Sequence, residues 1–179
     1  MQISRLQLIL SSLIVCLSLV GCFGKNISNI EYLSRHVADP VNSPYVKVLQ
    51  ASLDNDSHLW IKMEFMNSSG NEVAFDPRKF ILQDSDDNVI LPSYKGRGLN
   101  RASKILTSEL PPGTVVAGPM RGKLFAPKTL RPGRRSEGIL IFRVDDEFKD
   151  KLVMFFPSVK DTLGESIEMA PVVLEISPE

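Results

Sequence analysis

The sequence predicts a mostly β protein whose architecture is an antiparallel β-sandwich. Short runs rich in β-branched and aromatic residues recur along the chain, and residues 59–65 place Leu59, Ile61, Met63 and Phe65 on one face of a strand. Turn-forming residues separate these runs, and the 12 prolines and 11 glycines are scattered rather than clustered. Short strands joined by such turns are typical of a sandwich.

The bulk composition is that of one globular domain with a short additional segment. The chain has 179 residues, of which 43% are hydrophobic, enough for an ordinary core. Lysine and arginine together number 21, and so do aspartate and glutamate, so no overall positive charge favours nucleic acid as a partner. We therefore expect one domain at residues 45–179 and no nucleic-acid binding.

The N-terminal segment has the pattern of a signal peptide. Arg5 supplies one positive charge, and residues 6–20 (LQLILSSLIVCLSLV) carry none. This apolar run is shorter than the roughly 20 residues that a permanent transmembrane helix needs. Residues 1–21 are therefore expected to be a signal peptide. The alternative is an uncleaved membrane anchor in which Cys22 has no role.

Residues 19–22 (LVGC) resemble the lipobox of bacterial lipoproteins. The resemblance implies that the sulfur of Cys22 receives a diacylglyceryl group, that a peptidase cuts before Cys22, and that the new amino group is acylated with a fatty acid such as palmitate. Two or more acyl chains hold a protein firmly on a membrane, whereas one chain does so only marginally. Because Phe23 rather than aspartate follows the cysteine, the resemblance favours the outer membrane, facing the periplasm.

Residues 22–44 are predicted to be a lipidated tether. They mix Asn, Ser, Gly and Pro with isolated apolar residues, a composition typical of a flexible spacer. The alternative is one weak helical turn, for which Ile27, Ile30 and Leu33 have suitable spacing.

The domain then alternates between strands and turns. The predicted strands are residues 45–53, 59–65, 73–83 with an interruption at Asp76-Pro77, 89–91, 139–144, 152–156 and 171–176. Turns rich in Asn, Asp and Ser are predicted at residues 67–71 and 84–88, and the second should join two strands as a hairpin. Residues 99–110 could form a short helix ended by Pro111, so an irregular or partly helical insertion is expected near residues 95–125.

The order of several short motifs resembles small secreted bacterial immunoglobulin-like domains of unassigned function. The motifs are a hydrophobic strand followed by Asn and a small-residue turn (59–70), a strand ending in Asp (80–84), a Pro-Gly turn (130–133), and a Gly-apolar-apolar-Phe strand (138–144). The resemblance covers about residues 45–176 and implies an immunoglobulin-like sandwich. It offers no catalytic residues to transfer to this chain.

Catalytic and metal-binding patterns are lacking. The only cysteines, Cys16 and Cys22, lie in the first 22 residues, and His36 and His58 have no second ligand at zinc spacing. No G-x-S-x-G nucleophile motif occurs. We expect no catalytic residue, no metal and no cofactor.

Two acidic runs leave alternatives open. Residues 84–88 (DSDDN) suggest calcium, but they lack the glycine and distal glutamate of a helix-loop-helix calcium site, so a solvated hairpin turn fits better. Residues 145–147 (DDE) could perform acid–base chemistry only if burial raised the pKa of one carboxyl.

Two basic clusters form the candidate binding patch, which comprises Lys95, Arg97, Arg101, Lys104, Arg131, Arg134 and Arg135. Such clusters suit anionic lipid, lipopolysaccharide, cell-wall polymer or an acidic protein surface. The alternative is that they serve solubility alone. Trp60 points away from the core row of its strand, where packing under a loop is expected rather than ligand binding.

These features predict a membrane-anchored envelope lipoprotein that binds or assembles with an envelope protein and is not an enzyme. One alternative is a carrier of lipid or cell-wall fragments, which would need a deep apolar cavity in the sandwich. The other is an envelope hydrolase that uses carboxylates.

Overall fold

The computed structural model describes residues 25–26, 29–32, 42–54, 57–93, 110–144 and 151–175. Over these ranges the chain forms thirteen β-strands and one short 3₁₀ helix, η1 (Pro77–Lys79), and the paired strands are all antiparallel. The prediction of a mostly β fold is thereby confirmed. Within the described ranges no helix is long and apolar enough to cross a membrane.

The first sheet has four strands in the order β1 (Lys25–Asn26), β3 (Tyr45–Leu53), β4 (His58–Met66) and β11 (Arg135–Arg143). Strands β4 and β11 pair along their whole length, from Arg135 opposite Met66 to Arg143 opposite His58. On the other side of β4, the β3 pairing shifts register between Val48 and Gln50. A bulge of this kind increases the local twist of a strand.

The second sheet has five strands in the order β2 (Asn29–Tyr32), β13 (Val172–Glu175), β12 (Lys151–Phe155), β6 (Ile81–Gln83) and β7 (Val89–Ile90). The predicted hairpin across residues 84–88 is confirmed, because Leu82 pairs with Ile90 and Gln83 with Val89.

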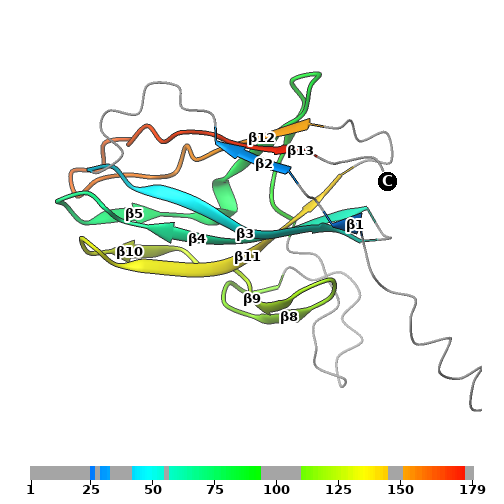
Figure 1. Ribbon diagram of the computed structural model, residues 1–179. Coiled ribbons are helices and arrows are strands. Elements are labelled where there is room, and N and C mark those ends of the chain that lie inside the picture. Colours follow the sequence, from blue (N-terminus) through cyan, green and yellow to red (C-terminus); the bar gives the residue numbers. More distant parts are fainter. Residues whose placement is uncertain are drawn as a thin grey trace, which may run out of the picture.

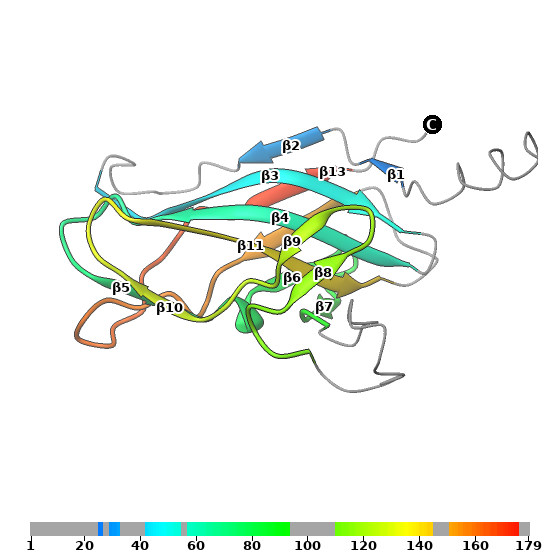
Figure 2. The ribbon, with the colours of Figure 1, turned by 90° about the horizontal axis from the view of Figure 1, so that it is seen from below.

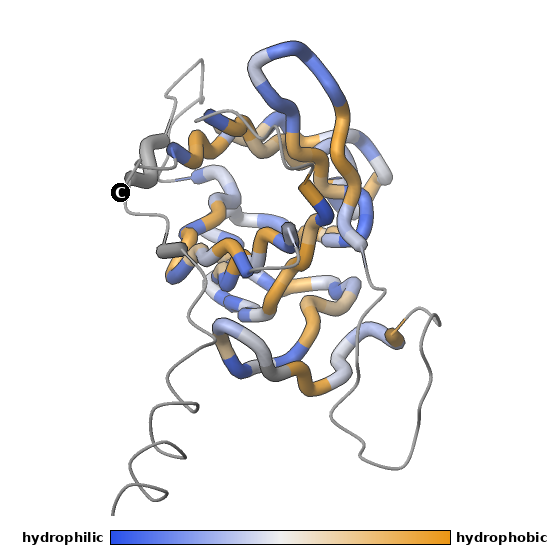
Figure 3. The backbone as a smooth tube through the Cα atoms, turned by 90° about the vertical axis from the view of Figure 1, so that its right-hand side faces the viewer, coloured by the Kyte–Doolittle hydropathy of each residue, from blue (hydrophilic) through white to orange (hydrophobic). Residues whose placement is uncertain are grey.

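The two sheets lie one above the other and enclose the main core (Figure 1). Leu59, Ile61, Met63 and Phe65 of β4 have no exposed surface, as the alternation in the sequence predicts. From the second sheet, Leu82, Leu152, Met154, Val172 and Leu174 meet them. Figure 3 shows hydrophobic and hydrophilic residues alternating along the strands, the pattern expected when one face of each sheet is buried.

Two short ribbons complete the fold. The first pairs β5 (Val73–Phe75) with β10 (Lys128–Leu130), and the second is a hairpin of β8 (Val115–Ala117) and β9 (Arg121–Lys123). The β8–β9 hairpin lies across the outer face of the first sheet, over β4 and β11 (Figure 2). It builds a second apolar cluster there, formed by Trp60, Val116, Met120, Leu124, Ile139 and Ile141.

Part of the predicted insertion differs from expectation. Residues 94–109, and with them nearly all of the predicted helix, lie outside the described residues, and Leu110 is not helical. In the described remainder to residue 125 no helix is seen, and residues 115–123 form the β8–β9 hairpin. The reason is that its apolar side chains cover an apolar strip on the first sheet, a long-range contact that local sequence patterns do not reveal.

Six residues of the predicted tether also lie in strands. Lys25 and Asn26 pair with Leu53 and Ser52 at the edge of the first sheet, and β2 pairs with β13 at the edge of the second. Sheet edges offer rows of backbone hydrogen-bonding groups, so even a polar segment can add a strand. The predicted signal peptide and Cys22 lie outside the described residues.

Candidate functional site

The basic patch predicted from the sequence is only partly within the described residues. Lys95, Arg97, Arg101 and Lys104 lie outside them. Their flanks are described: the Ser93 backbone N–H donates to the Ile141 carbonyl at 2.6 Å, and Leu110 packs against the second apolar cluster. Both flanks therefore adjoin the C-terminal half of β11.

The other three arginines lie at the opposite end of β11. Arg131 and Arg134 flank the turn that leads into β11, and Arg135 is its first residue. We call residues 131–135 the basic turn. The Arg131 Nε lies 3.3 Å from Glu72 Oε1, and the Arg135 Nη1 lies 3.3 Å from Glu64 Oε2.

These ion pairs leave the arginines available. The Arg131 and Arg135 side chains are 83% and 69% exposed. Both partners of the Arg131–Glu72 pair are exposed, and such a pair contributes about 0–1 kcal/mol, so a partner's carboxylate can replace Glu72 at little cost. Arg134 is exposed as well, and no carboxylate among the described residues lies within ion-pair distance of its side chain.

A buried asparagine holds the basic turn in place. Asn67 has no exposed surface, and its Nδ2 donates to the carbonyls of Asn71 and Leu130, both at 2.8 Å. Its Oδ1 accepts from the Ser69 backbone N–H and hydroxyl. Its backbone N–H donates to the Arg134 carbonyl, and its own carbonyl accepts from the Gly133 N–H.

Asn67 thus ties the 67–71 turn to the basic turn. Every polar group of this buried residue has a partner, as burial of polar atoms requires. From the sequence, Asn67 is predicted only as a turn residue. Its contacts with Leu130 and Arg134 join segments more than sixty residues apart, and local sequence patterns do not reveal such contacts.

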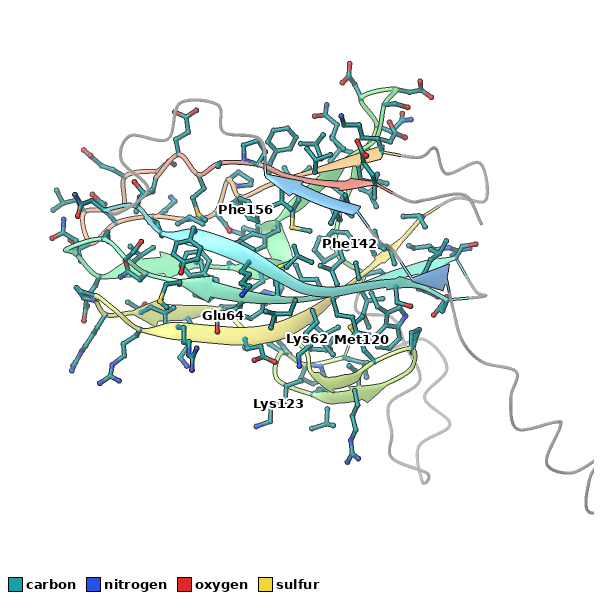
Figure 4. The ribbon with its side chains drawn as sticks, viewed as in Figure 1. Lys62, Glu64, Met120, Lys123, Phe142 and Phe156 are labelled. Carbon is teal, nitrogen blue, oxygen red and sulfur yellow. The ribbon has the colours of Figure 1, made fainter. Side chains whose placement is uncertain are left out.

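Charged side chains continue from the basic turn along the outer face of the first sheet. Lys62 of β4 lies 2.8 Å from Glu137 of β11, and Glu64 meets Arg135. Figure 4 shows Lys62 and Glu64 on β4, with Glu64 farther from the β8–β9 hairpin than Lys62, and Lys123 of β9 pointing away from the domain. One end of this face is thus charged, and the hairpin covers the other.

Trp60 lies beneath the hairpin, on the side of β4 opposite the main core, as predicted. It is 9% exposed and packs in the second apolar cluster, and its indole Nε1 donates to Asp54 Oδ2 at 2.9 Å. Asp54 also accepts from the His58 backbone N–H at 2.8 Å, and its Oδ1 lies 3.4 Å from the His58 Nδ1. Asp54 therefore joins the ends of β3 and β4.

The acidic run at residues 84–88 forms the predicted hairpin turn. Asp84 Oδ1 accepts from the backbone N–H groups of Asp86 and Asn88, both at 2.9 Å, and Oδ2 accepts from the Asn88 side chain. The carboxylate of Asp84 is thus used to close the turn. Residues 145–147 lie outside the described residues. Across the described ranges, no three His, Cys, Asp or Glu side chains gather as metal ligands would.

A shallow, open depression of about 420 Å³ lies where β5 and η1 meet residues 157–160. Ala74, Phe75 and Pro157 form its apolar part, and Lys79 and Lys160 bring two positive charges. No carboxylate of the described part of the chain pairs with either lysine. The backbones of Ala74 and Lys160 hold the two segments together through hydrogen bonds of 2.9 and 2.8 Å.

Asp76 and Ser158 stabilise the wall of this depression. The Ser158 hydroxyl donates to the Asp76 carbonyl at 2.7 Å. The Asp76 carboxylate receives two hydrogen bonds from the Arg78 guanidinium, at 2.8 and 2.7 Å, and these lower its pKa below the ordinary value. Sequence reasoning missed the depression, because its two sides come from segments about eighty residues apart.

Comparisons with known proteins assign neither a family nor a function to the chain. No protein-family model matches the chain, and no curated protein does. A crystal structure that is similar to it is that of the yjhA protein from Bacillus subtilis, with 15% sequence identity, 76% of this chain and 77% of that chain covered, and a TM-score of 0.35. A likeness of this extent carries no inference about function.

Proposed function

We propose that this protein is a bacterial envelope lipoprotein, anchored through Cys22, that acts as a non-catalytic binding or assembly module. The observation that carries the proposal is the LVGC sequence at residues 19–22, directly after an uncharged apolar run too short to span a bilayer. We further propose that the two facing sheets form an immunoglobulin-like sandwich, and that the protein sits on the outer membrane, facing the periplasm.

The binding role is supported by the basic turn. Its three arginines are exposed, and Asn67 holds the backbone of the turn that leads into β11 in place. A rigid scaffold that presents charged loops is the usual design of a recognition surface. Arginines of this kind pair well with carboxylates, so an acidic patch on another envelope protein is the partner that fits best.

The anchor is tested by Cys22→Ser. In cells given a radiolabelled or clickable fatty acid, the wild-type protein should take up label and remain with the membranes, whereas Cys22→Ser should take up none and be released or mislocalised. Cys16→Ser is the matched control. It removes the other thiol of the chain, which lies within the predicted signal peptide, and should leave labelling unchanged. Unchanged membrane retention of Cys22→Ser would defeat the lipoprotein proposal.

A second candidate is a carrier of an anionic envelope ligand, which the lysine-lined depression favours. Lys79 and Lys160 would hold a phosphate or carboxylate group, with the apolar part of the ligand against Phe75 and Pro157. Side chains such as Phe142 and Phe156 fill the space between the sheets (Figure 4), which speaks against a carrier with a deep apolar cavity in the sandwich, so this candidate requires a ligand bound on the surface. Loss of envelope-lipid binding in Lys79→Ala/Lys160→Ala, but not in Lys123→Ala, would favour this candidate.

A further inference from the structure

The pairing of β1 determines which end of the domain can face a membrane. Lys25 lies opposite Leu53, the last residue of β3, and Asn26 lies opposite Ser52. Because the pairing is antiparallel, the chain enters β1 from beyond the end of β3 and then runs into the sheet. Residues that precede Lys25 therefore join the domain at this end.

Only three peptide steps separate Cys22 from Lys25. A fully extended chain spans at most about 3.6 Å per residue, so the two Cα atoms cannot be more than about 11 Å apart. An acyl-anchored Cys22 would thus hold Lys25 close to the lipid headgroups. A free spacer of 22 residues would not have this effect.

The rest of the first sheet shows which residues lie at that end. Leu53 pairs with Leu59, and Leu59 with Phe142, so Lys25 is in one cross-strand row with the C-terminal part of β11. Strand β2 begins at Asn29, only three residues after Asn26 of β1, and Asn29 lies opposite Glu175. The C-terminal end of β13 therefore lies at the same end of the domain as β1. Figure 1 shows β1 and the C-terminal end of the β13 arrow toward the same side of the domain.

The basic turn lies at the other end. Arg135 and Arg143 are the first and last residues of β11, and eight residue steps of a strand span about 27 Å. Figure 1 shows the turn between β10 and β11 at the side opposite β1.

We propose that the domain stands on its membrane with the β1 end toward the lipid, so that the basic turn faces away from the membrane that anchors it. This inference rests on the proposed anchor at Cys22. Its consequence is that the acidic partner of Arg131, Arg134 and Arg135 is a protein surface lying farther from the membrane, and not the anionic lipid of the leaflet that holds the anchor.

The test compares two positions on the same strand. If Cys22 is acylated on its sulfur and Cys16 leaves with the signal peptide, the mature protein has no free thiol, so Arg143→Cys and Arg135→Cys can each be labelled singly with a fluorophore. Both residues are exposed arginines, and their positions in β11 place them on the same face of the sheet. The lipidated proteins are reconstituted into vesicles that carry a nitroxide quencher on the lipid headgroup.

The expected result is strong quenching of the label at position 143 and little quenching at position 135. A variant with ten Gly/Ser residues inserted between Cys22 and Lys25, a linker with a root-mean-square span of about 18 Å, should abolish this difference. Protein that floats with vesicles but shows equal quenching at both positions would overturn the orientation and leave the anchor intact. Protein that does not float with vesicles would contradict the anchor itself, and the orientation with it.

Discussion

Asn67 is a buried polar residue whose contribution to stability can be isolated. Replacement by leucine keeps the approximate volume but leaves the Leu130 and Asn71 carbonyls and the Ser69 N–H without this partner. Unsatisfied buried groups of this kind cost about 1–3 kcal/mol each, so we expect Asn67→Leu to lower the free energy of unfolding by about 2–4 kcal/mol.

Urea unfolding measures this effect. Asn71→Leu is the control, because Asn71 is exposed and takes part through its backbone carbonyl, so its substitution should cost at most about 0.5 kcal/mol. Equal stability of Asn67→Leu and Asn71→Leu would show that the Asn67 hydrogen bonds do not hold the two turns.

The Asp76–Arg78 pair predicts a dependence of stability on pH. The Arg78 hydrogen bonds lower the pKa of Asp76 below 3.8, so the folded state is stabilised above the pKa of the unfolded state and loses this contribution as the pH falls through the folded value. The pair is partly exposed, which limits its contribution to about 1 kcal/mol or less.

We therefore expect Arg78→Met to be slightly less stable than wild type at pH 7, and we expect this difference to shrink as the pH falls below 3.8 toward the lowered folded-state pKa of Asp76. Denaturant midpoints between pH 7 and pH 3 provide the measurement. Arg121→Met, which removes an exposed arginine without a carboxylate partner among the described residues, serves as the control for a lost charge. A difference between Arg78→Met and wild type that persists unchanged to pH 3 would contradict this assignment.

The β8–β9 hairpin covers Trp60 on the outer face of the first sheet. Trp60 is the only tryptophan of the chain, so its fluorescence reports directly on this contact. Val116 is 2% exposed and packs in the cluster, whereas the adjacent Val115 is 41% exposed and points outward. A charge at position 116 should therefore detach the hairpin, since an unpaired buried charge is strongly unfavourable.

We expect Val116→Asp to shift the Trp60 emission to longer wavelength and to increase its quenching by iodide, with Val115→Asp close to wild type. Emission spectra and iodide titrations give the comparison. If the two variants behaved alike, the hairpin would not be the cover of Trp60.

Local sequence patterns predicted some elements well and others not at all. The alternation along β4 predicted both its core row and the outward position of Trp60, because the period of a strand alone determines which face a side chain takes. The 84–88 turn followed from its Asp and Asn residues. In contrast, β1 and β2 consist of polar, tether-like sequence and exist through pairing with the edges of β3 and β13.

The same distinction applies to the candidate sites. Arg131, Arg134 and Arg135 were recognised because they are close in sequence, but the buried Asn67 that positions them contacts them across the fold. Lys79 and Lys160 meet only because Ala74 and Lys160 pair, and no local pattern indicates that contact.

For the whole molecule, the basic turn should determine partner binding. Reversal of charge in Arg131→Glu/Arg134→Glu/Arg135→Glu should reduce the recovery of partner proteins after cross-linking in intact cells, because three attractive charges become repulsive. Arg121→Glu/Lys123→Glu on the β8–β9 hairpin is the control for a change in net charge elsewhere on the surface. An unaltered set of cross-linked proteins in the triple variant would favour a role of these arginines in solubility alone.

Mass spectrometry of the mature protein can show whether Cys22 is its lipidated N-terminus. After trypsin digestion, we expect an N-terminal peptide of residues 22–25 (CFGK) that carries the added mass of a diacylglyceryl group and an amide-linked fatty acid. A peptide in which Gly21 is still joined to Cys22, or an unmodified Cys22, would contradict this expectation.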